Sequence, residues 1–266
     1  MTALSAISMV TRHIGLVATA STTFCEPYNL ARTLASVDLI SGGRAGWNIV
    51  TTSDPDSGQN FGRPEVEHDL RYEIADEFVE VMLGLWDSIE ADAVVADVES
   101  GQFVQREKVH FLDHVGKHFQ VRGPLNAARC PQGYPVLIQA GASKAGQRFA
   151  AKRAEVMFTV QQDLEMAKEF YADMKRQVTE CGRDPNHCKI MRAYCRSSAA
   201  PKKTHGPSSP SSGVTWTRRA PWRPCPSGLV MICLSIHSMA PSPNCPSKDG
   251  FKVGGAWFWP MRMKRT

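Results

Sequence analysis

The sequence predicts an α/β fold on a parallel sheet over residues 1–191, followed by a tail of different character. Short apolar runs alternate with segments of helical period, which is typical of βα units around a parallel sheet. From residue 192 onward this alternation stops, and ten of the 17 prolines lie there. Residues 192–266 also carry twelve basic residues and one acidic residue, a net charge of +11, whereas residues 1–191 carry −6. The amino-acid composition and the net charge of the chain therefore change abruptly after residue 191.

A strand and a helix are expected first, over residues 14–20 and 27–39. The strand is a run of small and apolar residues. Pro27 suits the first turn of the helix, because proline lacks an N–H that would have no partner there. Gly42 and Gly43 end the helix. Its apolar face is formed by Leu30, Leu34 and Val37.

The same alternation continues along the chain. A second strand is expected over 44–50, with a loop over 51–55 at its carboxyl end. The clearest helix covers 71–86, because apolar residues recur there every three or four positions. The remaining elements are strands at 135–141 and 156–160 and helices at 143–153 and 164–180.

Length and composition exclude several classes of protein. The 266 residues contain no apolar run long enough for a transmembrane helix. The N-terminus lacks the basic region of a secretory signal. Eight cysteines in a chain of this length are too sparse for a disulfide scaffold. We therefore expect a reduced, cytoplasmic protein without a membrane partner.

The most specific segment is residues 40–52, ISGGRAGWNIVTT. Six further segments occur with it: GLVATASTT at 15–23, EPY at 26–28, NFG at 60–62, HDLRY at 68–72, VRGPLN at 121–126 and QAGAS at 139–143. In these segments and their order, the chain resembles the FMN-dependent monooxygenases of the bacterial-luciferase superfamily. The group that it resembles most acts on nitrilotriacetate, EDTA, dibenzothiophene sulfone and long-chain alkanes. The resemblance covers residues 1–191.

The resemblance implies a TIM barrel of the luciferase-like type that binds FMN at the carboxyl ends of its strands, where barrel enzymes place their sites. Carried over by position, Thr19 and Asn48 would line the isoalloxazine ring. His68 and Tyr72 would lie beside the flavin and its phosphate chain. Asn48 and His68 are the expected catalytic residues.

The phosphate of FMN is expected at Ala142 and Ser143, where a strand gives way to a helix. Free backbone N–H groups at such a point suit a phosphate dianion. The family usually has two serines here, so Ala142 removes one hydroxyl donor.

The resemblance also implies a two-component reaction. A separate NAD(P)H:flavin reductase supplies reduced FMN, which forms a C4a-hydroperoxide with O₂ and oxygenates a small organic or xenobiotic compound. The cofactor carries the difficult chemistry, while the protein positions it and excludes water. Members of the family are expected to be homo-oligomers.

Each of these residues has a simpler interpretation without the resemblance. Thr19 would be a packed strand residue, and Asn48 a buried amide that needs partners. His68 and Tyr72, four apart, would form a surface and capping pair on one helix face. Ser143 would be the N-cap of a helix.

No metal site is expected. His110, His114 and His118 are four residues apart, which on a helix would place them on one face. Their surroundings favour an extended hairpin instead, in which residues four apart lie too far from one another to share an ion.

The chain departs from the family at both ends. Met1 aligns within a helix that precedes an interior strand, and we count four to five strands where a closed barrel has eight. We therefore expect a partial barrel in which part of the flavin site, including a usual acidic residue, is missing. This chain as written is then expected to bind FMN weakly or not at all and to give no turnover.

Residues 192–266 are expected to form a disordered or poorly packed tail rather than a folded domain, with 229–236 as a lone apolar run without a partner. Translation in a shifted reading frame explains the sudden change in composition. The alternative is a non-enzymatic fusion whose basic tail binds nucleic acid or acidic partners by counterion release. The basic residues are scattered and form no recognisable binding module, so nucleic acid is not the partner that we favour.

Overall fold

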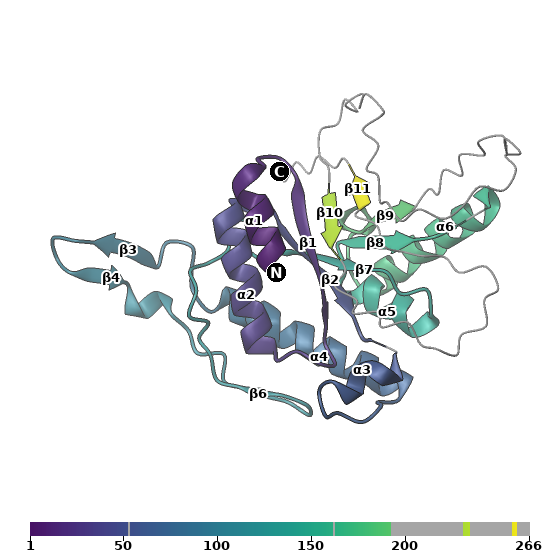
Figure 1. Ribbon diagram of the computed structural model, residues 1–266, viewed down its shortest axis with the longest axis horizontal. Helices are drawn as coiled ribbons and strands as arrows, with labels where there is room; N and C mark the ends of the chain where they lie inside the picture. The colour runs from purple at the N-terminus through teal and green to yellow at the C-terminus, as the bar shows by residue number, and fades with distance from the viewer. Residues whose placement is uncertain (53, 162, 193–230, 235–256, 260–266) are drawn as a thin grey trace, which may run out of the picture.

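A computed structural model describes residues 1–52, 54–161, 163–192, 231–234 and 257–259 (Figure 1). Its centre is one sheet of seven strands in the order β11-β10-β1-β2-β7-β8-β9. All neighbours run parallel except β11, which is antiparallel to β10. The strands are β1 (Gly15–Ser21), β2 (Ala45–Val50), β7 (Val136–Gln139), β8 (Val156–Thr159), β9 (Lys189–Arg192), β10 (Met231–Leu234) and β11 (Trp257–Trp259).

Helices connect the strands in the order that the sequence predicts. In Figure 1, α1, α2 and α4 lie together beside β1 and β2, and α5 and α6 lie toward β7, β8 and β9. The α-helices are α1 (Thr2–Val10), α2 (Pro27–Ser41), α3 (Pro55–Gln59), α4 (His68–Asp87), α5 (Lys144–Arg153) and α6 (Leu164–Glu180), with 3-10 turns η1 (Arg106–Lys108) and η2 (Pro185–His187). The bounds of α6 are those predicted, and α4 begins three residues earlier than predicted. Among the described residues, no helix combines the length and apolar character that crossing a membrane requires.

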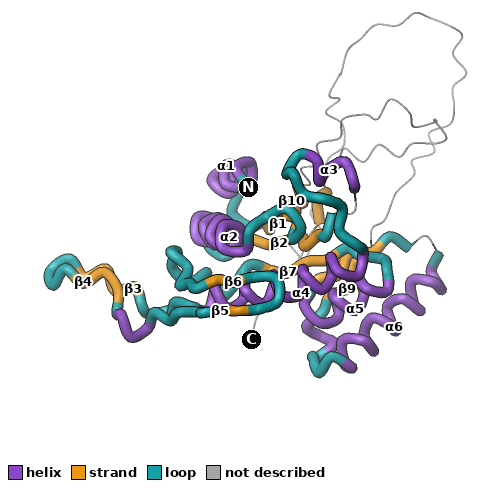
Figure 2. The backbone as a smooth tube through the Cα atoms, turned by 90° about the horizontal axis from the view of Figure 1, so that it is seen from below, coloured by secondary structure: helices purple, strands orange, loops and turns teal. Residues whose placement is uncertain are grey.

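Two hairpins leave the body of the molecule. The first pairs β3 (Val94–Asp97) with β4 (Gln102–Val104), and it projects away from the helices in both views (Figure 1, Figure 2). The second pairs β5 (His114–Val115) with β6 (Gln120–Val121). The second confirms the extended conformation that we expected around His114.

The helices cover one face of the sheet. Successive residues of a strand point to opposite faces, and Leu16 and Trp47 belong to the large core that includes Leu34 and Phe78. A smaller core joins α5, α6 and β8 through residues such as Met157. The opposite face carries a separate cluster formed by Val17, Ile138 and Val156. The two faces therefore have different neighbours, and polar strand residues in phase with Val17 lie on the face opposite the described helices.

Arg44 fixes the start of β2 against α1 and β1. Its Nη1 donates to the carbonyl of Ile14 at 2.8 Å, and its Nη2 donates to the carbonyls of Ser8 and Thr11 at 2.9 and 3.0 Å. Its Nε donates to the carbonyl of Ser41 at the end of α2 at 2.8 Å. Burial lowers the pKa of this guanidinium. One side chain thus satisfies carbonyls from three elements and sets the position of the strand that carries Asn48.

Most of the expected tail, 192–266, lies outside the described residues, so its poor packing and its origin stay predictions. One expectation about it is wrong. The run 229–236 does have a partner, because β10 pairs parallel with β1, with Gly15 opposite Met231. The backbone groups on the outer edge of β1 need hydrogen-bond partners, and an apolar run can supply them as a strand.

Candidate active site

Thr19 and Asn48 lie side by side on neighbouring strands. They are register partners on β1 and β2, and Asn48 Nδ2 donates to Thr19 Oγ1 at 3.1 Å. Asn48 Oδ1 is buried and has no hydrogen-bond partner among the described residues. Leaving a buried acceptor unpaired typically costs about 1–3 kcal/mol. The pair lies in phase with Val17, on the face opposite the described helices, and offers one acceptor to a ligand there.

His68 and Tyr72 begin α4 and pack against each other. Their ring centroids are 5.2 Å apart, with an angle of 60° between the planes. The ring of Tyr72 also packs on Phe149 of α5, with the centroids 5.9 Å apart. This confirms that the two residues, four apart on the helix, share a face.

The Tyr72 hydroxyl lies against the loop that precedes α5. A Cβ atom placed on Gly146 would be 2.8 Å from this hydroxyl oxygen, and one placed on Gly141 would be 3.1 Å from it. Real Cβ atoms are almost never found as close as the first of these distances. The absence of a side chain at Gly146 therefore lets the hydroxyl reach the start of α5.

Ser143 is the N-cap of α5, as its simpler interpretation predicts. Its Oγ accepts a hydrogen bond from the N–H of Gly146 at 3.1 Å. Gln139 Oε1 accepts from the N–H of Gly141 at 2.6 Å, and Gln147 Nε2 donates to the carbonyl of Ala142 at 2.9 Å. These bonds hold the loop in shape. The cap leaves the first N–H groups of α5 without partners within the helix, beside the Tyr72 hydroxyl.

The structure thus gathers the predicted residues into two groups. One group is Thr19 with Asn48, and the other combines His68 and Tyr72 with the loop of Ala142 and Ser143. No hydrogen bond found among the described residues joins the two groups. They are nevertheless neighbours in the sheet, because β7, which leads into the loop, pairs with β2.

The sequence analysis missed a contact of His68. Its Nδ1 lies 2.9 Å from Asp69 Oδ1. Consecutive helix residues are turned by about 100°, which predicts that Asp69, next to His68, faces away from the site. In the first turn of α4, however, the short carboxylate folds back toward its neighbour. The side chains are 48% and 84% exposed, so the pair adds little stability, but the carboxylate favours a proton on Nδ1.

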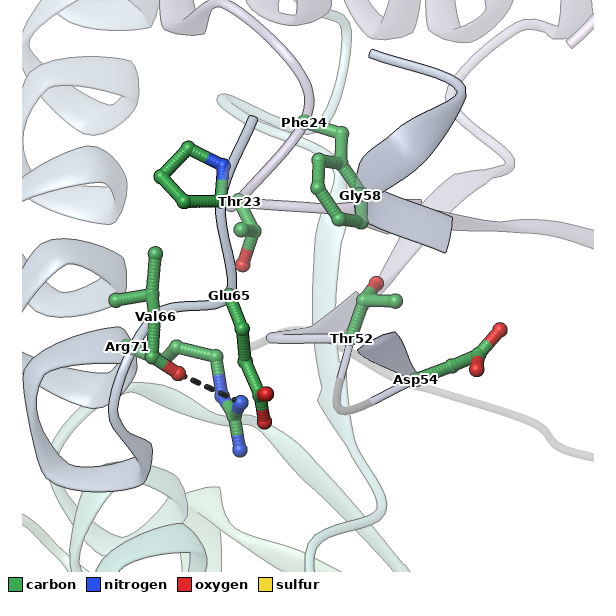
Figure 3. A pocket seen from close by; sticks show the side chains of 9 residues that line it. Thr23, Phe24, Thr52, Asp54, Gly58, Glu65, Val66 and Arg71 are labelled. Carbon is green, nitrogen blue, oxygen red and sulfur yellow. Dashed lines mark hydrogen bonds between the residues drawn. The ribbon is translucent and has the colours of Figure 1, made fainter. Parts of the chain in front are cut away.

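A hollow at the carboxyl ends of β1 and β2 was also missed (Figure 3). It is a shallow hollow that is open to solvent. Thr52, on its wall, has a φ of 35°, which is unusual for a β-branched residue, and its hydroxyl donates to Ser21 Oγ at 2.7 Å. The hydroxyl residues that follow both strands were the available signal in the sequence. The lining residues are Thr23, Phe24, Thr52, Asp54, Gly58, Pro64, Glu65, Val66 and Arg71.

The three spaced histidines bind separate carboxylates. His114 Nε2 lies 3.1 Å from Glu77 Oε1, and His118 Nε2 lies 2.9 Å from Glu73 Oε1. His110 pairs with a third carboxylate, Glu90, at 2.7 Å. Two of the three therefore attach the β5–β6 hairpin to α4.

Glu77 is the centre of this attachment. Burial by itself raises its pKa, but hydrogen bonds from His114 and from the N–H groups of Phe119 and His118 outweigh burial and lower the pKa. The hairpin is held chiefly by a carboxylate that accepts backbone N–H groups.

A sequence profile described as luciferase-like monooxygenase matches residues 1–201. The chain belongs to the luciferase-like monooxygenase family. It is 55% identical over 191 residues to N-acetyl-S-(2-succino)cysteine monooxygenase of Bacillus subtilis, a match that covers 71% of this chain and 43% of that protein. It is 51% identical over 191 residues to nitrilotriacetate monooxygenase component A of Aminobacter aminovorans, covering 71% and 42%.

Solved structures place this luciferase-like chain in the same fold. The crystal structure of a long-chain alkane monooxygenase superposes with a TM-score of 0.69 at 41% identity, covering 71% of this chain and 44% of that one. A riboflavin lyase structure with modified FMN and riboflavin superposes with a TM-score of 0.70 at 37% identity, covering 73% and 43%. The parallel sheet and its helices therefore belong to the luciferase-like TIM-barrel fold. The chain spans roughly two fifths of the length of these relatives.

Proposed function

We propose that this chain carries flavin-binding residues of an FMN-dependent monooxygenase. Reduced FMN would come from a separate NAD(P)H:flavin reductase, and the product would be a small organic compound oxygenated with O₂. Family membership supports the class of reaction, and the name of one relative, a component A, supports the division between two proteins.

The observation that best supports flavin binding is the state of Asn48 Oδ1. It is a buried acceptor that no described residue satisfies, in an amide held by the bond from Nδ2 to Thr19. An isoalloxazine ring is flat and largely apolar and has N–H donors at its edge. Such a ring suits both the unmet acceptor and the apolar cluster of Val17 and Ile138 on the same face.

The second group of residues suits the phosphate end. The Tyr72 hydroxyl lies against the loop at the start of α5, whose first N–H groups have no acceptor within the helix. A dianion is favoured there by the helix dipole as well. Ala142 supplies only its backbone, so Tyr72 and Ser143 would provide the side-chain contacts.

Each of these residues would then have its own role in binding and using the flavin. Thr19 orients the amide of Asn48, which accepts an N–H of the ring. His68, with Nδ1 beside Asp69, has its other ring nitrogen, Nε2, available for a hydrogen bond to the flavin. The apolar cluster on the same face excludes water. When bound, reduced FMN supplies the reaction with O₂ and the oxygen transfer.

Titration with FMN and with riboflavin tests this proposal, because only FMN has the phosphate. We expect weak binding by this chain, with FMN preferred. Tyr72→Phe should weaken FMN binding by about ten-fold, the loss of one hydrogen bond to a charged group, and leave riboflavin binding unchanged. Asn48→Ala should weaken binding of both. Tyr171→Phe, on the exposed side of α6, is the matched control.

The result that would contradict the proposal is a chain that binds FMN and riboflavin equally and is indifferent to both substitutions. Turnover requires a complete barrel. A chimera in which residues 1–191 replace the matching stretch of the Bacillus subtilis relative should therefore oxygenate that enzyme's substrate when coupled to a flavin reductase.

A further inference from the structure

Arg71 is a buried cation with one donor that no described residue uses. It lies on α4 and is only 7% exposed. Its Nη1 donates to the carbonyl of Val66 at 2.9 Å (Figure 3), whereas its Nε has no hydrogen-bond partner among the described residues. Buried charges in proteins are normally paired. A guanidinium with a free N–H on the wall of a hollow therefore points to an anionic ligand.

The hollow lies beside the proposed flavin site but is distinct from its phosphate loop. Thr23 follows β1 and Thr52 follows β2 on its wall, so it opens at the carboxyl ends of the strands that carry Thr19 and Asn48. Tyr72, the neighbour of Arg71 on α4, turns toward Gly146 instead. Consecutive helix residues differ by about 100° in direction, so Arg71 does not serve the same anion as Tyr72.

Two carboxylates on the rim do not neutralise Arg71. Asp54 is engaged as the N-cap of α3, where Oδ2 accepts from Ser57 Oγ at 2.7 Å and Oδ1 from the N–H of Asp56 at 3.3 Å. Glu65 is exposed and lines the same hollow as Arg71. No ion pair within 4.0 Å joins either of them to Arg71 in the described part of the chain. Glu65 would instead repel an incoming anion.

We propose that this hollow binds a carboxylate group of a small organic acid, with Arg71 as its cationic donor. A planar guanidinium matches a planar carboxylate. The inference rests on the proposed function and extends it, because the hollow adjoins the flavin residues and the carboxylate would be that of the compound to be oxygenated.

Arginine Nε–H signals provide a direct test on the full chain without flavin. In the ¹⁵N-labelled protein, the Arg71 signal is identified by its disappearance in Arg71→Lys. Succinate is the probe, succinamide is its uncharged counterpart, and inorganic phosphate tests for a general oxyanion site. We expect succinate alone to shift the Arg71 signal saturably. The Arg63 signal should stay in place, because the Arg63 terminal nitrogens already bind Thr23 and Glu26.

Two substitutions make the test quantitative. Arg71→Lys keeps the charge but loses the planar donor pair, and we expect it to raise the dissociation constant for succinate at least about ten-fold. Glu65→Gln removes the repelling charge from an exposed position, and we expect it to lower that constant several-fold. Arg63→Lys is the matched control. It should leave both the dissociation constant for succinate and the Arg71 signal unchanged.

Three results would each overturn the inference: no shift of the Arg71 signal at saturating probe, an equal response to succinamide, or tighter binding of phosphate than of succinate. An unchanged constant in Glu65→Gln would overturn it as well. FMN titration of the same samples separates the two proposals. A chain that binds FMN but not succinate refutes only this inference, and one that binds succinate but not FMN leaves this inference standing without a flavin site in the chain as written.

Discussion

Gly146→Ala sets two opposing effects against each other at the start of α5. Alanine is favoured over glycine inside a helix by about 1 kcal/mol. The new Cβ, however, would lie 2.8 Å from the Tyr72 hydroxyl oxygen, 3.1 Å from Gly141 Cα and 3.2 Å from Ser143 Oγ. Overpacking of this kind typically costs about 1–3 kcal/mol. We expect the clash to win and the free energy of unfolding to fall by about 1 kcal/mol.

The double substitution shows whether Tyr72 is the obstacle. Tyr72→Phe removes the oxygen that makes the shortest of the three contacts, so Gly146→Ala should be roughly neutral in that background. The difference between the two backgrounds is a coupling energy, which we expect to be about 1 kcal/mol. Urea unfolding of the four variants measures it. FMN affinity in Gly146→Ala should fall with stability, because the hydroxyl is pushed away from the loop.

Equal effects of Gly146→Ala in both backgrounds would refute this reasoning. So would a net stabilisation by Gly146→Ala alone. Either result would mean that the Tyr72 hydroxyl does not lie against the loop, and the phosphate contact that we propose for it would lose its structural support.

Three further predictions concern the frame of the site and its proton chemistry. Arg44→Lys should lower the free energy of unfolding by about 2–4 kcal/mol in urea, because several partly buried carbonyls lose their donor; an exposed control, Arg32→Lys, should change it little. Burial raises the pKa of Asp38 against the hydrogen bonds from Ala45 and Gln132, so its folded form holds the proton more tightly than the unfolded form. The free energy of unfolding of the wild type, minus that of Asp38→Asn, should therefore fall as the pH rises from the pKa of Asp38 in the unfolded chain through its raised pKa in the folded protein. A difference that stays constant or rises with pH would contradict this. In the chimera, His68→Ala should lower oxygenation efficiency by roughly ten- to a hundred-fold. Asp69→Ala should have a smaller effect than His68→Ala, and the reverse order would show that the assignment of His68 is wrong.

The sequence alone determined the family and the main strands and helices between residues 14 and 180, but it missed α3, the β3–β4 hairpin and β9. Helix periodicity and end signals are local, so Pro27, Gly42 and the bounds of α6 could be read without a structure. Seven ordered segments identified the family, because their order along the chain is itself information.

Contacts between distant segments were decided only by the tertiary structure. The unmet acceptor of Asn48, the reach of Tyr72 to Gly146 and the free Nε of Arg71 depend on where helices and strands pack, which no local pattern contains. The pairing of β10 with β1 was missed for the same reason, because an apolar run does not by itself indicate which edge strand of a sheet it will pair with. Asp69 was misjudged because helix geometry gives the direction of a Cβ atom, whereas a short exposed side chain in the first turn can fold back onto its neighbour.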